Sequence, residues 1–448
     1  MTRTVATDSR PALPGAQIDL LYGLLSLGST AIWGVMSAWL LYFYLPPEGE
    51  GSALVPAALY GGAMLALRVL SAAITPTIGY LSDRTRTRLG RRLPYILGSA
   101  LPMLVFFVLL WTPPFRGTSP WNLVYLVAVL AGYNLAYILN QVPTMALLPE
   151  IAVTDAHRVR VSTWAAVMTV LGMMLAAGAG PLIERFGFAH TALIYAVVLL
   201  PAFYLPLLVL RERPEHQARP AVRLNFRQNL ASMMRNRAFL FMTATGFCFW
   251  GIMGLVQASV PYIVTEICLL QESDTLMFYL PAVLASLLCY PLINWLAQRW
   301  GKWRVFAGSL LTSALVLPGL MLIGDWLPLS LKAQGMLWVT LQAAALSGVV
   351  VLPRALGAEI VDHDEELTGQ RREGIYYATW GLLDQVVNGV MAALLPLLLL
   401  LGRSHLEPQG PLGVRLVGAL GGAFMLAGFL IFLRYPLGRG RSAGKGQV

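Results

Sequence analysis

Charged residues are scarce in this sequence, and their scarcity excludes an ordinary soluble domain. Only 12% of the 448 residues are Asp, Glu, Lys or Arg, whereas soluble domains carry roughly a quarter. Hydrophobic residues make up 57% of the chain. Apolar runs of about 20 residues recur from end to end, each long enough to cross a bilayer core of roughly 30 Å. We therefore expect an integral membrane protein.

Cysteines and catalytic motifs are also sparse. Cys248, Cys268 and Cys289 lie in or beside apolar runs and form no CxxC pair, which argues against a zinc site or a disulfide framework and favours packing roles. The chain has no Walker lysine motif, so ATP is not expected to drive it. It has neither an HExxH motif nor a Ser/His/Asp order. We expect no enzyme activity, no metal and no organic cofactor.

Twelve apolar runs follow one another, separated by charged or Pro- and Gly-rich breaks. They are continuous rather than alternating, so they predict helices and not barrel strands. The longest polar stretch divides them six and six. The expected parts are a cytoplasmic tail at 1–19, a six-helix half at 20–210, a cytoplasmic linker at 211–237, a second half at 238–434 and a basic cytoplasmic tail at 435–448.

The net charge of +10 raises the possibility of a nucleic-acid partner. The arginines, however, are not interleaved with aromatics on one polar face, and they sit in the short breaks between apolar runs. Most of the 32 Lys and Arg residues lie in the two tails and after even-numbered spans, and positive residues near span ends stay cytoplasmic. We expect both termini in the cytoplasm, no nucleic-acid binding and no cleaved signal, since the first 19 residues are polar.

The two halves echo each other. The stretch "PTIGYLSDRTRTRLGRR" from Pro76 corresponds to "PLINWLAQRWGKWR" from Pro291 at the close of the second span of each half. Internal repeats of this kind are typical of transporters whose site lies between the repeats, near the bilayer midplane. We expect an all-α membrane protein with twelve transmembrane helices in two six-helix pseudo-symmetric halves.

Four stretches carry a resemblance to a known family. They are "GYLSDRTRTRLGRRLPYILG", "LLYGLLSLGS", "NQVPTMALLPEI" and "EIVDHDEELTGQRREGIYY". Together they resemble the major facilitator superfamily, and within it the glycoside-pentoside-hexuronide:cation symporters, the melibiose-permease-like family. The resemblance implies the major facilitator fold and alternating access, in which two halves rock about a central site.

Several positions depart from that family. The resemblance implies two aspartates one helical turn apart in the second span, where they hold a cation, but Ser71 and Thr75 stand there. The family's sugar-contacting and coupling side chains are also replaced, at Thr30, Gln141, Met145 and Gln385. Four acids and the opposing lysine have become neutral together. We therefore expect the scaffold without its usual sodium and galactoside sites.

Two charges remain deep within spans. Arg68 is the family arginine of span two, and Asp384 lies near the middle of span eleven. Charges inside a membrane are costly and are functional candidates by default. We expect the two to pair, or to take turns pairing with the solute, with a static ion pair as the alternative. Asp384 is the candidate proton-coupling acid, and H+ the candidate coupling ion.

Other polar side chains are expected to complete a neutral cavity suited to a polyol or an amphiphile. Asn134, Tyr137 and Gln141 share one face of span four. Each polar residue could instead join two helices, as buried Asn and Gln often do. The full set of candidates is Thr30, Trp33, Asn134, Tyr137, Asn140, Gln141, Gln257, Gln342, Trp380, Gln385 and Asn388.

Charged residues at the cytoplasmic span ends predict a gate of breakable ion pairs, with topology alone as the alternative. Metal binding by the acidic run in "EIVDHDEELTGQRREG" is less favoured, because its acids are consecutive. The candidate gate residues are Asp83, Arg84, Arg91, Arg92, Glu150, Arg158, Arg299, Glu359, Asp362, Arg371 and Arg372.

The sequence thus favours a secondary active transporter of a small organic solute in a bacterial inner membrane. A sugar or glycoside follows from family analogy alone. A lysolipid or similar amphiphile is the alternative within transport, and a non-transporting membrane assembly or receptor protein is the alternative outside it. The expected partners are the solute and the lipid bilayer, and the chain is expected to act as a monomer.

Overall fold

The computed structural model describes residues 15–47, 51–87, 89–151, 155–209, 236–368, 373–401 and 412–436. These residues are almost entirely helical. The helices of the first half are α1 (Gly15–Tyr44), α2 (Ala57–Arg84), α3 (Leu93–Leu109), α4 (Pro120–Ile151), α5 (Asp155–Ala177) and α6 (Ala179–Val209). The long helices of the second half are α8 (Arg237–Tyr262), α9 (Thr275–Trp300), α10 (Lys302–Val316), α11 (Leu331–Thr368), α12 (Glu373–Leu398) and α13 (Leu412–Phe432).

The prediction of twelve membrane-spanning helices is confirmed. Eleven helices of the described chain are long and apolar enough to cross a membrane, and the shorter apolar helix Leu93–Leu109 completes the set. On this helix Leu97, Leu101 and Val105 follow at four-residue spacing and are 39%, 53% and 47% exposed, so they form one outward apolar stripe.

Two helix boundaries differ from the expected division. The first helix begins at Gly15, within the predicted tail, and Asp19 in its second turn is paired with His157 and Arg160 of α5. Helix α8 begins at Arg237, where Asn236 caps it by accepting hydrogen bonds from the amides of Ala238 at 3.0 Å and Phe239 at 3.2 Å. The remainder of the predicted linker, at 211–235, lies outside the described residues.

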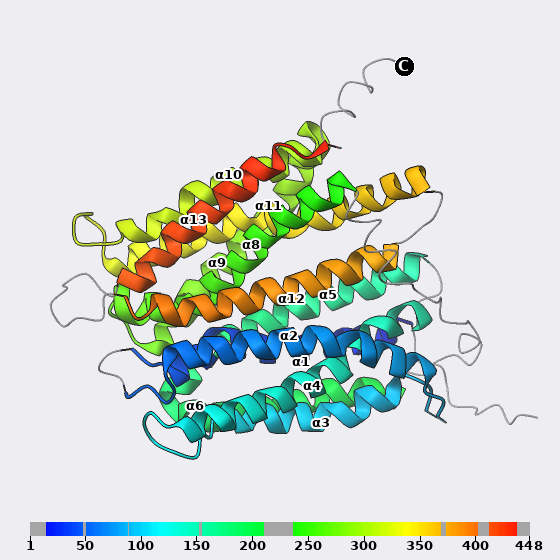
Figure 1. Cartoon of the computed structure of the whole chain (residues 1–448), viewed down its shortest axis with the longest axis horizontal. Coiled ribbons are helices and arrows are strands. Elements are labelled where there is room, and N and C mark those ends of the chain that lie inside the picture. Colours follow the sequence, from blue (N-terminus) through cyan, green and yellow to red (C-terminus); the bar gives the residue numbers. More distant parts are fainter. Residues whose placement is uncertain are drawn as a thin grey trace, which may run out of the picture.

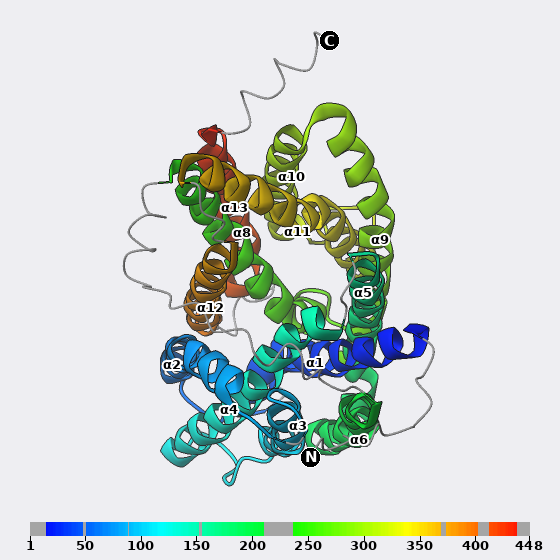
Figure 2. The ribbon, with the colours of Figure 1, turned by 90° about the vertical axis from the view of Figure 1, so that its right-hand side faces the viewer.

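The two halves lie one above the other in Figure 1. They meet along α2 and α12 and, on the other flank, along α5 and α9, and Figure 2 looks along the bundle onto one end of it. We call this the basic end, because Arg84, Arg160, Arg299, Lys302 and Arg434 lie at helix termini there. The other end is called the opposite end.

Contacts between the halves close the opposite end. The Tyr262 hydroxyl, at the end of α8, donates to the carbonyl of Leu45 at 2.8 Å, and its ring lies 5.1 Å from that of Tyr42. The amide of Ser273 donates to a carboxylate oxygen of Glu184 at 3.1 Å. Beyond Tyr262 the chain continues as a π-helix, η2 (Ile263–Ile267), and then a short 3-10 helix, η3 (Glu272–Asp274).

At the basic end the halves diverge. Helices α4 and α11 lie on opposite sides of the bundle axis in Figure 2, and within the described ranges they do not pack against each other. The chain is therefore described in a conformation that is closed at the opposite end and spread at the basic end.

Candidate functional site

The polar face of α12 contains the candidate acid Asp384. Asn388 lies one helical turn further on, and its amide donates to the Asp384 carboxylate at 3.0 Å and to the Asp384 carbonyl at 2.9 Å. The turn before carries Trp380, whose indole nitrogen donates to the Thr243 hydroxyl of α8 at 2.9 Å. The bond from Trp380 holds this face of α12 against α8, and the bond from Asn388 fixes the direction of the carboxylate.

Arg68 approaches this face from the other half. Gly389 of α12 lies directly against it, and a β-carbon added there would be 2.9 Å from the Arg68 Cβ. Arg68 lies within electrostatic range of Asp384 and of Tyr133 and Tyr137 on α4. Direct pairing of Arg68 with Asp384 is absent from the described conformation. That the two alternate with solute remains a prediction.

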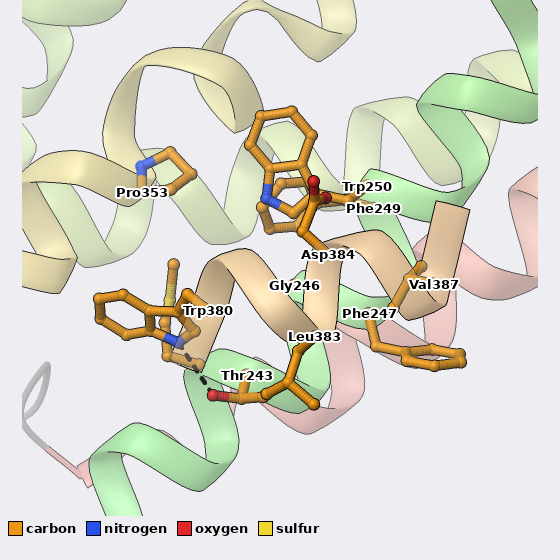
Figure 3. Close-up of a pocket in the computed structure, with 11 residues that line it drawn as sticks. Thr243, Gly246, Phe247, Phe249, Trp250, Pro353, Trp380, Leu383, Asp384 and Val387 are labelled. Carbon is orange, nitrogen blue, oxygen red and sulfur yellow. Dashed lines mark hydrogen bonds between the residues drawn. The ribbon is translucent and has the colours of Figure 1, made fainter. Parts of the chain in front are cut away.

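A cavity of about 160 Å³ lies beside Asp384 (Figure 3). It is formed by α8, α11 and α12, and Asp384 is directed into it toward the ring of Trp250. Its surface is overwhelmingly apolar, with Asp384 as its one charged group. The lining residues are Met242, Thr243, Gly246, Phe247, Phe249, Trp250, Pro353, Trp380, Leu383, Asp384 and Val387.

Some of the predicted polar residues of α4 bond to neighbouring helices, and others are only half-buried. Asn140 is fully buried and its amide donates to the Ile96 carbonyl of α3 at 3.3 Å. Successive helical residues are turned by about 100°, and Asn140 faces α3 in this conformation, so its contact with solute stays a prediction. Gln141 donates to the Ser29 hydroxyl of α1. Asn134 is half-buried, and Tyr137 stacks on Tyr133 at 6.0 Å.

The remaining cavity candidates are spread over both halves. Thr30 packs against α5, because a β-carbon at Gly172 would lie 3.0 Å from the Thr30 Cβ. Trp33 is 37% exposed. In the second half Gln342 is buried, whereas Gln257 and Gln385 are half-buried. Trp380 is thus the candidate that lines the cavity with Asp384, and Asn388 orients the carboxylate.

The altered cation positions lie on α2. The Thr75 hydroxyl donates to the Ser71 carbonyl at 2.7 Å, and Ser71 itself is buried. Neither side chain carries a negative charge, and the Thr75 hydroxyl hydrogen is used within the helix. Among the described residues, moreover, no group of three His, Cys, Asp or Glu could hold a metal ion.

Those predicted gate residues whose side chains the structure describes lie at the basic end. Lys302 and Glu359 form an ion pair at 2.7 Å within the second half. Arg84 lies over the Tyr80 ring at 4.1 Å, and Arg299 lies over the Trp295 ring at 5.5 Å.

The other gate candidates differ in exposure. Arg92 is buried, Arg91 is half-buried and Asp362 is exposed. The side chains of the remaining gate candidates fall outside the described part of the chain: Asp83, Glu150, Arg158, Arg371 and Arg372.

One charged cluster was missed by the sequence reasoning. Asp19, in the second turn of α1, is fully buried and forms ion pairs with His157 at 2.7 Å and with Arg160, both on α5. The signal in the sequence was an acid directly before the apolar run "LLYGLLSLGS", a position that a polar tail also explains. The cluster joins α1 to α5 at the basic end.

Replacing Asp19 by alanine is expected to lower the stability of the first half. The change leaves the Arg160 guanidinium and the His157 imidazole without their common partner, at a cost of roughly 2 kcal/mol, below the value for wholly buried pairs because Arg160 is half exposed. Thermal unfolding of the detergent-purified protein measures the effect. Asp325→Ala, in an exposed loop, is the matched control, and equal melting temperatures for both variants would contradict the role of the cluster.

Comparison with known proteins agrees with this architecture. The family model for MFS/sugar transport proteins matches residues 21–439. An uncharacterized symporter of Synechocystis sp. is 25% identical over 94% of each chain. The isoprimeverose transporter of Lactiplantibacillus pentosus is 26% identical over 79% of this chain and 74% of its own.

A solved structure shows the same fold. The xylose transporter XylE from E. coli, in an inward open conformation, superposes with a TM-score of 0.64 at 14% identity, covering 95% of this chain and 97% of its own. Because the family model spans most of the sequence and twelve apolar helices form two six-helix halves, the chain belongs to the MFS/sugar transport protein family and is a membrane transporter of the major facilitator superfamily.

Proposed function

We propose that the protein is a proton-coupled secondary transporter of a sugar or glycoside, working by alternating access. One observation carries the coupling: an intramembrane carboxylate, Asp384, faces a cavity beside Arg68 of the other half. A carboxyl at this place can hold a proton when the solute is bound. When the site is empty it can release that proton, and the Arg68 charge then balances the ionised carboxylate. The solute class is supported by a relative named as an isoprimeverose transporter and a structural neighbour named as a xylose transporter.

Coupling to sodium is disfavoured by the residues of α2. Ser71 and Thr75 supply only neutral oxygen atoms, and Na+ sites of this family type depend on carboxylates. The distribution of basic residues favours the basic end as the cytoplasmic end, with both termini inside and the chain in a bacterial inner membrane. The spread of α4 from α11 at that end then corresponds to an inward-facing state. A monomer contains all of these elements.

Uptake by proteoliposomes tests the proposal directly. An inward proton gradient is expected to accelerate uptake of a radiolabelled sugar or methyl glycoside from a panel of hexoses and pentoses, whereas an inward sodium gradient at constant pH is expected to leave the rate unchanged. Liposomes without protein provide the control. Acceleration by sodium, or absence of uptake for the whole panel, would overturn the assignment in favour of a different ion or of the receptor alternative.

A further inference from the structure

The cavity beside Asp384 has a chemistry unlike that of a sugar site. Hydroxyl-rich solutes require several polar partners, but the cavity wall consists mainly of Phe, Trp, Leu, Val and Met side chains. The Thr243 hydroxyl already accepts the hydrogen of the Trp380 indole, and one oxygen of Asp384 already accepts from Asn388. The several hydroxyls of a sugar would therefore find too few partners inside it, whereas an apolar group needs none.

The size of the cavity limits its occupant. A dry apolar cavity of about 150 Å³ in a protein core takes up benzene, and this cavity measures about 160 Å³. One aromatic ring or a short branched alkyl group fills it, whereas the acyl chain of a lysolipid would extend well beyond it. The cavity is also accessible from outside the protein, because Phe247 and Trp250 in its wall are 41% and 38% exposed.

The hydrogen-bonding groups lie on the adjoining surface. Asp384 lies at the edge of the apolar wall, and Arg68 of the other half lies within electrostatic range of Asp384 and of Tyr133 and Tyr137 on α4. Asn134 lies one turn before Tyr137 on α4. A solute with an apolar group in the cavity would thus place its polar part between Asp384 and α4, at the interface of the two halves.

We propose that the cavity formed by α8, α11 and α12 is an aglycone subsite, and that the solute is a glycoside whose aglycone is a single aromatic ring or a group of that size. This inference rests on the proposed transport function and specifies its substrate class. Aromatic side chains such as Trp250 and Phe249 offer edge and face contacts to a ring. The bound ring also removes water from around Asp384. Because an ionised carboxyl is costly without water, solute and proton binding then reinforce each other, opposed by the Arg68 charge and by the hydrogen bond from Asn388.

Matched pairs of methyl and phenyl glycosides of the same sugar test the subsite. The phenyl member of a pair is expected to bind about 30-fold more tightly, as burial of one ring predicts, measured by competition with uptake and by thermal stabilisation of the purified protein. Gly246→Leu is expected to remove this gain, so that the methyl and phenyl members of a pair bind with equal affinity. The first added carbon meets no clash, since its nearest neighbours, on Phe249 and Trp250, are 3.9 Å away, and the rest of the side chain fills the cavity.

Gly308→Leu is the matched control, because Gly308 lies on α10 with open space around it. Should Gly246→Leu fail to fold, Leu383→Asn introduces a polar group into the same wall and is expected to give the same loss. Equal affinity for the two members of a pair, or a phenyl gain that survives both cavity variants, would overturn the subsite while leaving sugar transport intact. Failure of every methyl and phenyl glycoside to bind would overturn the proposed function itself.

Discussion

Asp384→Asn is expected to abolish uptake driven by a proton gradient. The amide keeps the size of the side chain and can still interact with Asn388, but it cannot bind and release a proton, so the Arg68 charge loses the group that it balances. We expect the gradient-driven rate to fall about tenfold or more, because residue 384 no longer alternates between an ionised carboxylate and a neutral acid during the transport cycle. Initial rates in proteoliposomes with an imposed pH difference measure this.

Exchange of labelled for unlabelled solute separates coupling from folding. It needs no net proton movement, so the asparagine variant is expected to retain exchange while its pH profile becomes flat. Asp325→Asn makes the same chemical change in an exposed loop and should behave like the unmodified protein. A normal gradient-driven rate in Asp384→Asn would show that another group carries the proton.

Gly180→Leu is expected to open the opposite end and stop transport. Gly180 is the second residue of α6, and a β-carbon there would lie 2.4 Å from the carbonyl oxygen of Glu272 in η3. That approach is shorter than any real contact, so α6 and η3 must separate, and the neighbouring bond between Ser273 and Glu184 is lost with them. We expect the closed opposite end to become a minor state, with uptake reduced about tenfold or more.

Spin labels report this change directly. Labels at Ser52 and Asp325, both exposed at the opposite end, should show a longer mean separation in the Gly180 variant. Gly98→Leu is the matched control, because no atom lies within 4 Å of an added β-carbon on that exposed face of α3. An unchanged label separation together with normal uptake would contradict the role of this contact in closing the transporter.

The hydrogen-bond partners of the buried polar residues could not be predicted from the sequence. Asn140 and Gln141 are neighbours in the chain, yet Asn140 bonds to Ile96 of α3 and Gln141 to Ser29 of α1. Helical periodicity assigns faces within one helix, but it does not say which helix lies against each face. Polar groups buried in apolar surroundings bond to whatever acceptor is near, so their roles depend on packing.

Asp19 shows the same limit for charge. In the sequence Asp19 is the last acid of the polar stretch before the first apolar run. In the structure it is a buried partner of His157 and Arg160, which follow 138 and 141 residues later. Gly389 shows the same limit for glycine, since the reason for a glycine at this position is the close approach of Arg68 from the other half.

The sequence by itself determined the membrane class, the twelve helices, their division into halves and the family, because these depend on local hydropathy, on charge between spans and on contiguous motifs. It also singled out Arg68 and Asp384 as functional candidates, since a charge within an apolar run is costly wherever the run packs. Only the tertiary structure decided that Asp384 borders an apolar cavity and that the opposite end is closed. Both arise where segments distant in the chain meet, and the free energy of such contacts depends on neighbours that no single segment specifies.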